Sequence, residues 1–435
     1  MARQRVVVVG AGFAGISAVR QFADSDIEVL LLNRDNYHAF LPLLPQVAAC
    51  KLEPEHIVYP IRGLLRKLPN VEFATTEVKR IDPVSQVVET DSCLVHYDYL
   101  ILACGSTSHF LGVPGANKYS FPLKHLNHAV KLRNRILDCF ERSLFTPDRS
   151  QRQQLLTFTI VGGGATGVEL AGELIELIRG SLVKDYPSVD FHQVRVLLLQ
   201  AGEKLLPEMP PHLSDYAKCK LERMGVSVRV LQRVTQITED AVYLEDSQVI
   251  PTQTVIWTAG VHGNPDAEKW GLPTNKNGQV TVLPTLQVAE YPQVYVVGDL
   301  AALQDRKLPM VAPVATQQGI TAATNILRQI KGKNPQPLKY KHQGSMVIIG
   351  RHTAVASIGI NITGFLAWLL WLFIHLAFLP GICNRLHVLI NWVWNYLLSE
   401  SPVRLILPLG ASKLNPYLFT GSNDDHQNQK SEFKK

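Results

Sequence analysis

The sequence predicts an α/β fold of two dinucleotide-binding domains, followed by an amphipathic helical region near the C-terminus. Three observations predict it. Two strand–helix–strand units each carry the glycine spacing Gly-x-Gly-x-x-Gly, a later strand ends in Gly298-Asp299, and the C-terminal part contains an apolar, tryptophan-rich stretch. The chain has 435 residues, which exceeds the size of a single hydrophobic core, so two domains and a further segment are expected.

The first unit begins near the N-terminus. The β-branched run Arg5–Val9 predicts a buried parallel strand, residues 16–23 a helix, and residues 27–32 a second strand. The loop after the first strand carries three glycines, Gly10, Gly12 and Gly15. Glycines at these positions allow a tight turn, close approach of a pyrophosphate to the backbone, and close packing of helix on strand. The pyrophosphate then lies at the N-terminus of the helix, where free N–H groups favour an anion.

The same pattern returns in the second unit. Thr157–Val161 predicts the first strand, residues 168–178 the helix, and residues 194–199 the second strand. The glycines of this loop are Gly162, Gly164 and Gly167. Two unrelated glycine turns are the alternative interpretation, but both loops stand in complete strand–helix–strand contexts. We therefore expect one domain to hold FAD tightly and the other to bind NADH or NADPH as a substrate.

Strand ends elsewhere support this division. Residues 294–297 form a strand-like run into Gly298 and Asp299, and an acid there can bond a ribityl hydroxyl of a flavin or, alternatively, cap a helix. Gly105 and Gly260 follow runs that resemble the strands closing each domain. The predicted boundaries are 1–120 with 275–345 for the FAD-binding domain, 121–274 for the NAD(P)H-binding domain, 346–420 for a membrane-anchoring and dimerisation region, and 421–435 for a disordered tail.

Composition excludes several other classes of function. The net charge of +6 comes without a dense Lys/Arg block, so no nucleic-acid partner is expected. The six cysteines are scattered and form no CxxC pair, which argues against a disulfide framework, a metal site and a dithiol redox centre. The N-terminus runs directly into a strand without an export signal, and we expect a cytoplasmic protein.

The C-terminal part predicts a membrane partner. Residues 363–379 are apolar except for His375, contain Trp368 and Trp371, and lie at the lower length limit for a membrane span. Residues 384–398 place apolar side chains at helical spacing, namely Leu386, Leu389, Ile390, Val393 and Leu397. Two such helices favour an anchor that lies on the bilayer surface through residues 363–398. A transmembrane helix and a helix in a dimer core remain the alternatives.

Several connecting segments carry a resemblance to a known family. They are residues 33–38, 40–44, 167–174, 312–319, 344–346 and 364–398. Together they resemble the type II NAD(P)H:quinone oxidoreductases, flavoproteins with two Rossmann-like domains in a glutathione-reductase-like arrangement. The resemblance implies an FAD-dependent enzyme that oxidises NAD(P)H and reduces a membrane quinone without pumping protons. It also implies a homodimer, bound peripherally to the cytoplasmic face of a membrane.

The resemblance assigns roles to individual residues. A helix expected to start near Ala315 would direct its N-terminus at the flavin, with Val314 beside it, and its dipole would favour the anionic reduced ring. Gln317 and Gln318 correspond to the quinone site, although a pair of surface glutamines is the alternative. Glu169 corresponds to an acid near the nicotinamide and flavin that positions the nicotinamide or relays protons. A helix-start carboxylate is the plainer interpretation of Glu169.

The sequence departs from the family pattern at five positions. Asn33, which with Arg34 belongs to the expected FAD site, stands where an acid usually binds the FAD ribose. Gln200 stands where a glutamate usually holds the 2′-hydroxyl of NADH, so the chain is predicted to use NADPH at least as well as NADH. Three further departures surround the expected quinone site, at Pro45, Pro313 and Gln343.

Two other classes of function share these features. One is a reductase of the same fold that donates to a soluble acceptor and needs no tryptophan-rich tail. The other is a redox-sensing flavoprotein of low turnover. Sulfide:quinone reductases also share the fold, but they need a pair of cysteines beside the flavin, and the sequence nominates no such pair.

Overall fold

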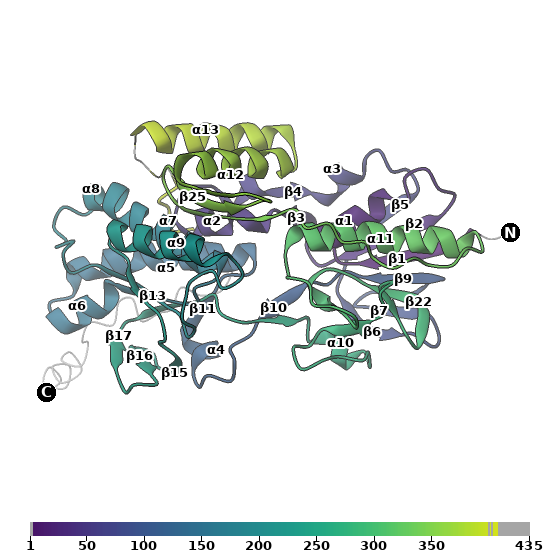
Figure 1. The fold of residues 1–435 in the computed structure, drawn as a ribbon, viewed down its shortest axis with the longest axis horizontal. Helices are drawn as coiled ribbons and strands as arrows, with labels where there is room; N and C mark the ends of the chain where they lie inside the picture. Colours follow the sequence, from purple (N-terminus) through teal and green to yellow (C-terminus); the bar gives the residue numbers. More distant parts are fainter. Residues whose placement is uncertain (1–2, 399–400, 402, 408–435) are drawn as a thin grey trace, which may run out of the picture.

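The computed structural model describes residues 3–398, 401 and 403–407. Two α/β lobes lie side by side, and two C-terminal helices lie across one end of their junction (Figure 1). The predicted disordered tail, 421–435, and the last part of the predicted anchoring region lie outside the described residues.

The first lobe is built on a six-stranded sheet. Its strand order is β21-β22-β9-β1-β2-β5, with bounds Gln287–Val288, Tyr291–Val296, Tyr99–Leu102, Arg5–Val9, Glu28–Asn33 and Val71–Thr75. All pairings are parallel except that of β21 with β22. The valines of β1 are buried because helices α1 (Phe13–Arg20) and α11 (Ala312–Ile330) pack over the sheet, as Figure 1 shows. This sheet therefore combines strands from the N-terminal part of the chain with strands from beyond residue 286.

The second lobe contains a parallel five-stranded sheet. Its order is β11-β18-β12-β13-β14, with bounds Ser120–Pro122, Thr254–Trp257, Thr157–Val161, Arg195–Leu199 and Ser227–Arg229. Its helices are α5 (Leu126–Phe145), α7 (Ala165–Leu177) and α9 (Pro211–Met224). The chain crosses between the lobes at β10 (Ser106–Ser108) and β19 (Val261–Gly263), which pair antiparallel.

The C-terminal part forms a small unit of its own. Strands β24 (Ser345–Gly350), β25 (Thr353–Ser357) and β26 (Asn361–Thr363) form an antiparallel meander. Helices α12 (Gly364–Phe378) and α13 (Ile382–Leu398) follow and leave large apolar side chains exposed on their outer faces. Among the residues that the structure describes, no helix is both long enough and apolar enough to cross a membrane.

The remaining elements complete these units. They are β3 (Tyr37–Ala39), α2 (Leu44–Ala48), β4 (Val58–Pro60), α3 (Ile61–Leu65), β6 (Val78–Asp82), β7 (Val87–Thr90), β8 (Leu94–His96), α4 (Ala116–Tyr119), α6 (Arg149–Leu155), α8 (Val183–Asp185), β15 (Val234–Ile237), β16 (Ala241–Leu244), β17 (Val249–Pro251), α10 (Asp266–Lys269), β20 (Val280–Val282) and β23 (Ala301–Leu303).

The helices after both glycine loops begin earlier than the sequence predicts. They start at Phe13 and Ala165, so Gly15 and Gly167 lie inside the first helical turn. The reason is that Gly12 and Gly164 are the extended residues that precede each helix. The third glycine of each motif is therefore part of the helix and packs against the loop.

Candidate functional site

The first glycine loop is shaped by contacts that only glycine permits. A Cβ on Gly15 would lie 1.8 Å from the carbonyl oxygen of Gly10, and one on Gly10 would lie 2.4 Å from the carbonyl oxygen of Ala103. At Gly12, by contrast, a Cβ would meet nothing within 4 Å. No side chain caps the helix at Gly12, so the N–H groups of its first turn have no side-chain partner. This loop has the form of a pyrophosphate cradle.

Polar side chains hold the loop in place. Asn33, at the end of β2, accepts a hydrogen bond from the N–H of Ala11 at 3.0 Å. His38 donates from Nδ1 to the carbonyl oxygen of Ala11 at 2.8 Å, and burial lowers the pKa of His38. Arg34 follows Asn33 with an exposed side chain. The loop is therefore fixed from both sides while its outer surface stays accessible.

Gly298 and Asp299 face this cradle from the other half of the lobe. Asp299 lies in a short 3-10 turn (Gly298–Leu300), where it accepts hydrogen bonds from Ser106 and, at 3.3 Å, from Lys124. Asp299 is not the cap of a helix, because Val297 precedes the turn. Gly105, next to Ser106, has φ +69° and open space where a Cβ would stand. A Cβ at Gly298 would lie 3.4 Å from that of Ala14, so this turn lies next to the helix that follows the first glycine loop.

Helix α11 begins beside Gly298. It starts at Ala312, three residues before the predicted position, because Val311 is extended and Pro313 favours the first turn of a helix. Val314 and Ala315 are buried in this first turn, and a Cβ at Gly298 would lie 3.7 Å from that of Ala315. No side chain caps this N-terminus either.

The two predicted glutamines of α11 have partners within the protein. Gln318 is buried and accepts a hydrogen bond from the N–H of Gly298 at 2.6 Å. Gln317 both donates to and accepts from the backbone of Lys341, each at 2.9 Å. A quinone that bonded either amide would have to replace one of these bonds, so the geometry supports positioning roles for both.

The second glycine loop repeats the geometry of the first. A Cβ on Gly167 would lie 1.9 Å from the carbonyl oxygen of Gly162, whereas one on Gly164 would meet nothing within 4 Å. Gln200 accepts a hydrogen bond from the N–H of Gly163 at 2.9 Å. Gly260 differs from these residues, because it packs against the carbonyl oxygen of His109 in the connection between the lobes.

Glu169 is buried one turn into α7. Its carboxylate accepts a hydrogen bond from the N–H of Ile348 at 3.3 Å. Burial raises the pKa of Glu169 to about 8, and the charge of Glu173 adds to the increase. The indole of Trp371 lowers the pKa of Glu169 and so opposes the effect of burial. The buried indole N–H has no hydrogen-bond partner of normal geometry among the described residues. Glu169 is therefore able to hold and release a proton near neutral pH.

A row of aromatic rings connects Glu169 with the first glycine loop. Phe13, directly after Gly12, contacts Phe40 with ring centroids 5.8 Å apart, and Phe40 contacts His375 at 6.2 Å. His375 stacks on Trp371 at 3.8 Å. Burial lowers the pKa of His375 to about 4, so the ring is neutral and donates from Nδ1 to the carbonyl oxygen of Trp371. Helix α12 thus forms a wall between the two loops.

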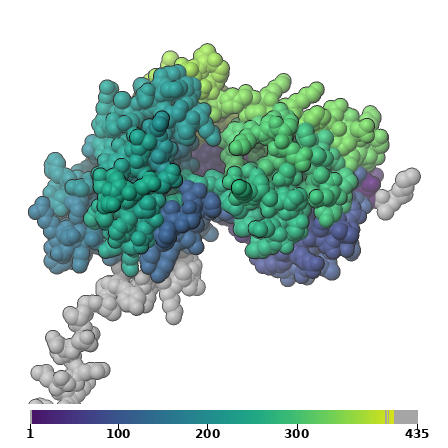
Figure 2. Space-filling model, turned by 60° about the horizontal axis from the view of Figure 1, so that its bottom comes forward, coloured from purple at the N-terminus to yellow at the C-terminus, as the bar shows by residue number. Residues whose placement is uncertain are grey.

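This wall was not among the predicted site residues. The sequence singled out Trp371 and His375 only as parts of an anchor, because nothing local indicates which side of α12 faces inward. The space-filling view shows the two lobes meeting at a hollow whose floor has the colour of N-terminal residues (Figure 2).

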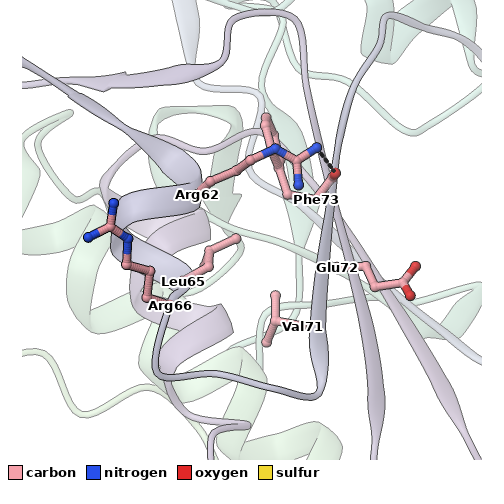
Figure 3. A pocket seen from close by; sticks show the side chains of 6 residues that line it. All are labelled: Arg62, Leu65, Arg66, Val71, Glu72 and Phe73. Atoms are coloured by element: carbon pink, nitrogen blue, oxygen red, sulfur yellow. Dashed lines mark hydrogen bonds between the residues drawn. The ribbon is translucent and has the colours of Figure 1, made fainter.

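A separate cavity lies away from this junction. It measures about 470 Å³ and is lined by α3 and β5, where Arg62 lies over the ring of Phe73 and donates to its carbonyl oxygen (Figure 3). None of its lining residues belongs to either glycine loop. The cavity therefore adds nothing to the site at the junction.

Comparisons with known proteins agree with this arrangement. The family model for pyridine nucleotide-disulphide oxidoreductases matches residues 4–319, and that for the NDH2 C-terminal domain matches residues 342–400. The chain is 36% identical to the type II NADH:quinone oxidoreductase Ndh of Mycobacterium tuberculosis, over 91% of this chain and 88% of the relative. It is 30% identical to that of Staphylococcus haemolyticus, over 83% and 92%.

Solved structures show the same fold. NDH2 of Plasmodium falciparum in complex with NADH aligns with a TM-score of 0.86 at 19% identity, covering 94% of this chain and 100% of that one. The sulfide:quinone oxidoreductase of Aquifex aeolicus aligns with a TM-score of 0.71 at 19% identity, covering 91% and 96%. With two glycine loops, a C-terminal helical unit and relatives matched over most of their length, this chain belongs to the type II NADH:quinone oxidoreductase family.

Proposed function

We propose that the chain oxidises NADH through bound FAD and reduces a membrane quinone, in a reaction that does not pump protons. The observation that carries the proposal is the convergence of two glycine loops and helix α12 on one junction. The row Phe13, Phe40, His375 and Trp371 spans that junction and ends at Glu169. The relatives named NADH:quinone oxidoreductases support the same reaction.

The residues of the first lobe fit FAD. Gly10, Gly12 and Gly15 would hold the pyrophosphate, and Asp299 would exchange its bond with Ser106 or Lys124 for a ribityl hydroxyl. The uncapped start of α11 at Val314 and Ala315 would face the flavin, with Gly105, Asn33 and Arg34 completing the site. When bound, FAD supplies the chemistry that accepts a hydride and passes two electrons on.

The second loop would bind the nicotinamide dinucleotide. Its residues Gly162, Gly164 and Gly167 follow β12, and Gln200 holds the loop through Gly163. Gly260, which follows β18 in the connection between the lobes, would complete the site. Gln200 carries no charge, so it does not repel the 2′-phosphate of NADPH. We therefore propose that NADPH serves as a second donor.

Glu169 is the proposed proton donor of the site. Its raised pKa keeps the carboxyl protonated at neutral pH, and the neighbouring Trp371 N–H can stabilise the carboxylate after the proton leaves. Gln318 orients the Gly298 turn, and Gln317 fixes the segment at Lys341 that borders the junction. These two are proposed as positioning residues.

We further propose that α12 and α13 lie on a lipid surface, at the cytoplasmic face of a membrane. Their outer faces expose large apolar side chains, including Leu366 at 69%, Phe373 at 71% and Ile382 at 75%. Phe373→Ser with Ile382→Ser is expected to abolish co-sedimentation with liposomes. Phe145→Ser, which removes an aromatic ring 85% exposed on α5, is the matched control and should leave binding unchanged.

A homodimer formed through the same region is also proposed, and sedimentation of the detergent-solubilised protein tests it.

Anaerobic rapid mixing tests the proposed reaction. NADH and NADPH should each bleach the flavin absorbance of the purified protein, and ubiquinone or menaquinone analogues should then restore it. Fast bleaching without restoration by any quinone would favour the soluble-acceptor reductase. Slow turnover with every acceptor would favour the redox-sensing flavoprotein.

A further inference from the structure

Three acidic side chains lie along one face of α7. Glu169, Glu173 and Glu176 are spaced by four and three residues, which places them on the same side of a helix. Glu173 is only 1% exposed. The face packs tightly against β24, since a Cβ at Gly172 would lie 1.7 Å from the carbonyl oxygen of Ile349. Buried carboxylates are unfavourable without partners, so this row requires a cation or exchangeable protons.

A single lysine from the N-terminal part of the chain forms ion pairs with two of these acids. Lys51, which follows α2 and is itself buried, forms ion pairs with Glu173 and, at 2.7 Å, with Glu176. Burial acts to lower the pKa of Lys51, but the two carboxylates together outweigh it and the pKa is raised. Lys51 therefore stays charged. One ammonium balances the charge of only one of the two carboxylates, so the cluster can bind one more proton.

The other groups around the cluster are also defined. Gln46 donates to Glu173 at 3.3 Å and accepts a hydrogen bond from the indole of Trp392 at 2.8 Å. Glu176 accepts a hydrogen bond from the backbone N–H of Arg351. Burial raises the pKa of Glu173, and the negative charge of Glu176 raises it further, whereas the positive charge of Lys51 lowers it. The net effect is a raised pKa. The side chain of Glu173 is 1% exposed and that of Glu176 is 17% exposed, so burial favours a neutral carboxyl at Glu173.

A small crevice connects the cluster with the surface between α12 and α13. It has a volume of about 30 Å³, enough for one or two water molecules, and it is partly open. Lys51, Glu173 and Ile348 line the crevice, together with residues of both helices such as Leu372 on α12 and Tyr396 on α13. Ile348 is also the residue whose N–H bonds Glu169. Glu173, which lines the crevice, lies one helical turn from Glu169 on α7.

The proposed reaction needs a proton from solvent. NADH provides two electrons and one proton as a hydride, whereas the quinol carries two electrons and two protons. The balance is NADH + H⁺ + quinone → NAD⁺ + quinol, so each turnover must bring one proton from solvent to the quinone.

We propose that Lys51, Glu173 and Glu176 form the proton-entry path from the crevice between α12 and α13 to Glu169. Water in the crevice delivers the proton to Glu173, and Glu173 passes it along the face of α7 to Glu169. Lys51 is a positioning residue that keeps the two outer carboxyl groups together. The inference rests on the proposed function, because only a reaction that consumes a proton at the junction requires such a path.

Glu173→Gln is the decisive variant. It leaves Lys51 paired with Glu176, so the fold is expected to survive, but it removes the carboxyl that receives the proton. Glu53→Gln is the matched control, because Glu53 faces the buried Arg133 at 3.9 Å and lies outside the path. Both variants are studied as holoproteins, with separate measurement of flavin reduction by NADH and reoxidation by a quinone analogue.

In Glu173→Gln we expect unchanged flavin reduction, with reoxidation slowed by at least about tenfold and a larger solvent deuterium isotope effect. Small weak acids such as acetate or imidazole should restore part of the rate, which a merely structural defect would not allow. Equal reoxidation rates in wild type, Glu173→Gln and Glu53→Gln overturn the path. Equal slowing of both half-reactions without rescue also overturns it. If the wild-type flavin is not reoxidised by any quinone, the proposed function fails instead.

Discussion

The two glycine loops are built alike. In each, a side chain at the end of the second strand accepts a hydrogen bond from a loop N–H, at 3.0 Å for Asn33 and Ala11 and at 2.9 Å for Gln200 and Gly163. In each, the third glycine packs against the carbonyl oxygen of the first. The local sequence alone therefore produces the same cradle twice.

The helices that follow the loops differ. Helix α1 carries no acid and packs within its own lobe against α11, where a Cβ at Gly319 would lie 2.1 Å from the carbonyl oxygen of Ala14. Helix α7 packs against the C-terminal strand β24 and carries Glu169 and Glu173 on that face. The helix after the first loop thus packs entirely within its own lobe, which suits a resident cofactor. The helix after the second loop packs against the C-terminal unit that carries α12, which suits a substrate that exchanges beside the chemistry.

The largest expected effect separates the two loops. Valine at Gly12 or Gly164 meets no protein atom within 4 Å of its Cβ, and both residues have ordinary φ values near −75°, so the fold should tolerate either change. Gly12→Val should be purified without FAD, because the side chain occupies the place of the pyrophosphate. Gly164→Val should retain FAD but raise the KM for NADH by about tenfold or more. Flavin-to-protein ratios and steady-state kinetics measure both effects, and a colourless Gly164→Val protein would contradict the division of roles.

The fold and both cradles could be predicted from the sequence because their geometry is local. Glycine spacing, buried strands and helix starts are set within about 30 residues, and they place Asn33 and Gln200 correctly at the strand ends. The cluster at Lys51 could not be predicted in this way. Its partners Glu173 and Glu176 lie more than 120 positions further along the chain, and the spacing of the acids does not tell whether their face is buried.

Glu169→Gln should have the next largest effect. The amide cannot donate a proton, so quinone reduction should fall by about 100-fold while flavin reduction by NADH persists. The protonated wild-type carboxyl is lost as pH rises through about 8, so wild-type activity should decline there and the residual activity of the variant should not. A variant that keeps the wild-type rate and its decline would show that another group supplies the proton.

Stability provides an independent control for the same variant. The pKa of Glu169 is about 8 in the folded protein against an ordinary value of 4.5, so the native state binds the proton more tightly than the unfolded chain. The stability contributed by this group is therefore present below pH 4.5 and decreases as pH rises toward 8. As the pH rises over this range, the Tm of the wild type should fall relative to that of Glu169→Gln. Thermal unfolding at several pH values would measure this change.

A smaller effect is expected at the second strand end. Gln200→Glu keeps an oxygen for the N–H of Gly163 but places a negative charge beside the expected 2′-position of the nucleotide. The ratio of kcat/KM for NADPH over NADH should fall by about tenfold, because the carboxylate repels the 2′-phosphate and bonds the 2′-hydroxyl. An unchanged ratio would mean that the nucleotide ribose lies elsewhere.

The corresponding change in the first loop should matter least. Asn33→Asp keeps the acceptor for the N–H of Ala11 and strengthens that bond by its charge, but it loses the donor that bonds the carbonyl oxygen of Asp35 at 2.8 Å. The two changes oppose each other, each worth about 1 kcal/mol, so FAD affinity should stay within about fivefold of wild type. Equilibrium titration of the deflavinated protein with FAD measures this. The comparison fails if Asn33→Asp loses most of its FAD while Gln200→Glu keeps wild-type binding of its nucleotide. The two strand ends would then share a geometry but not a tolerance to the acid, because FAD binding would depend on the amide of Asn33 itself.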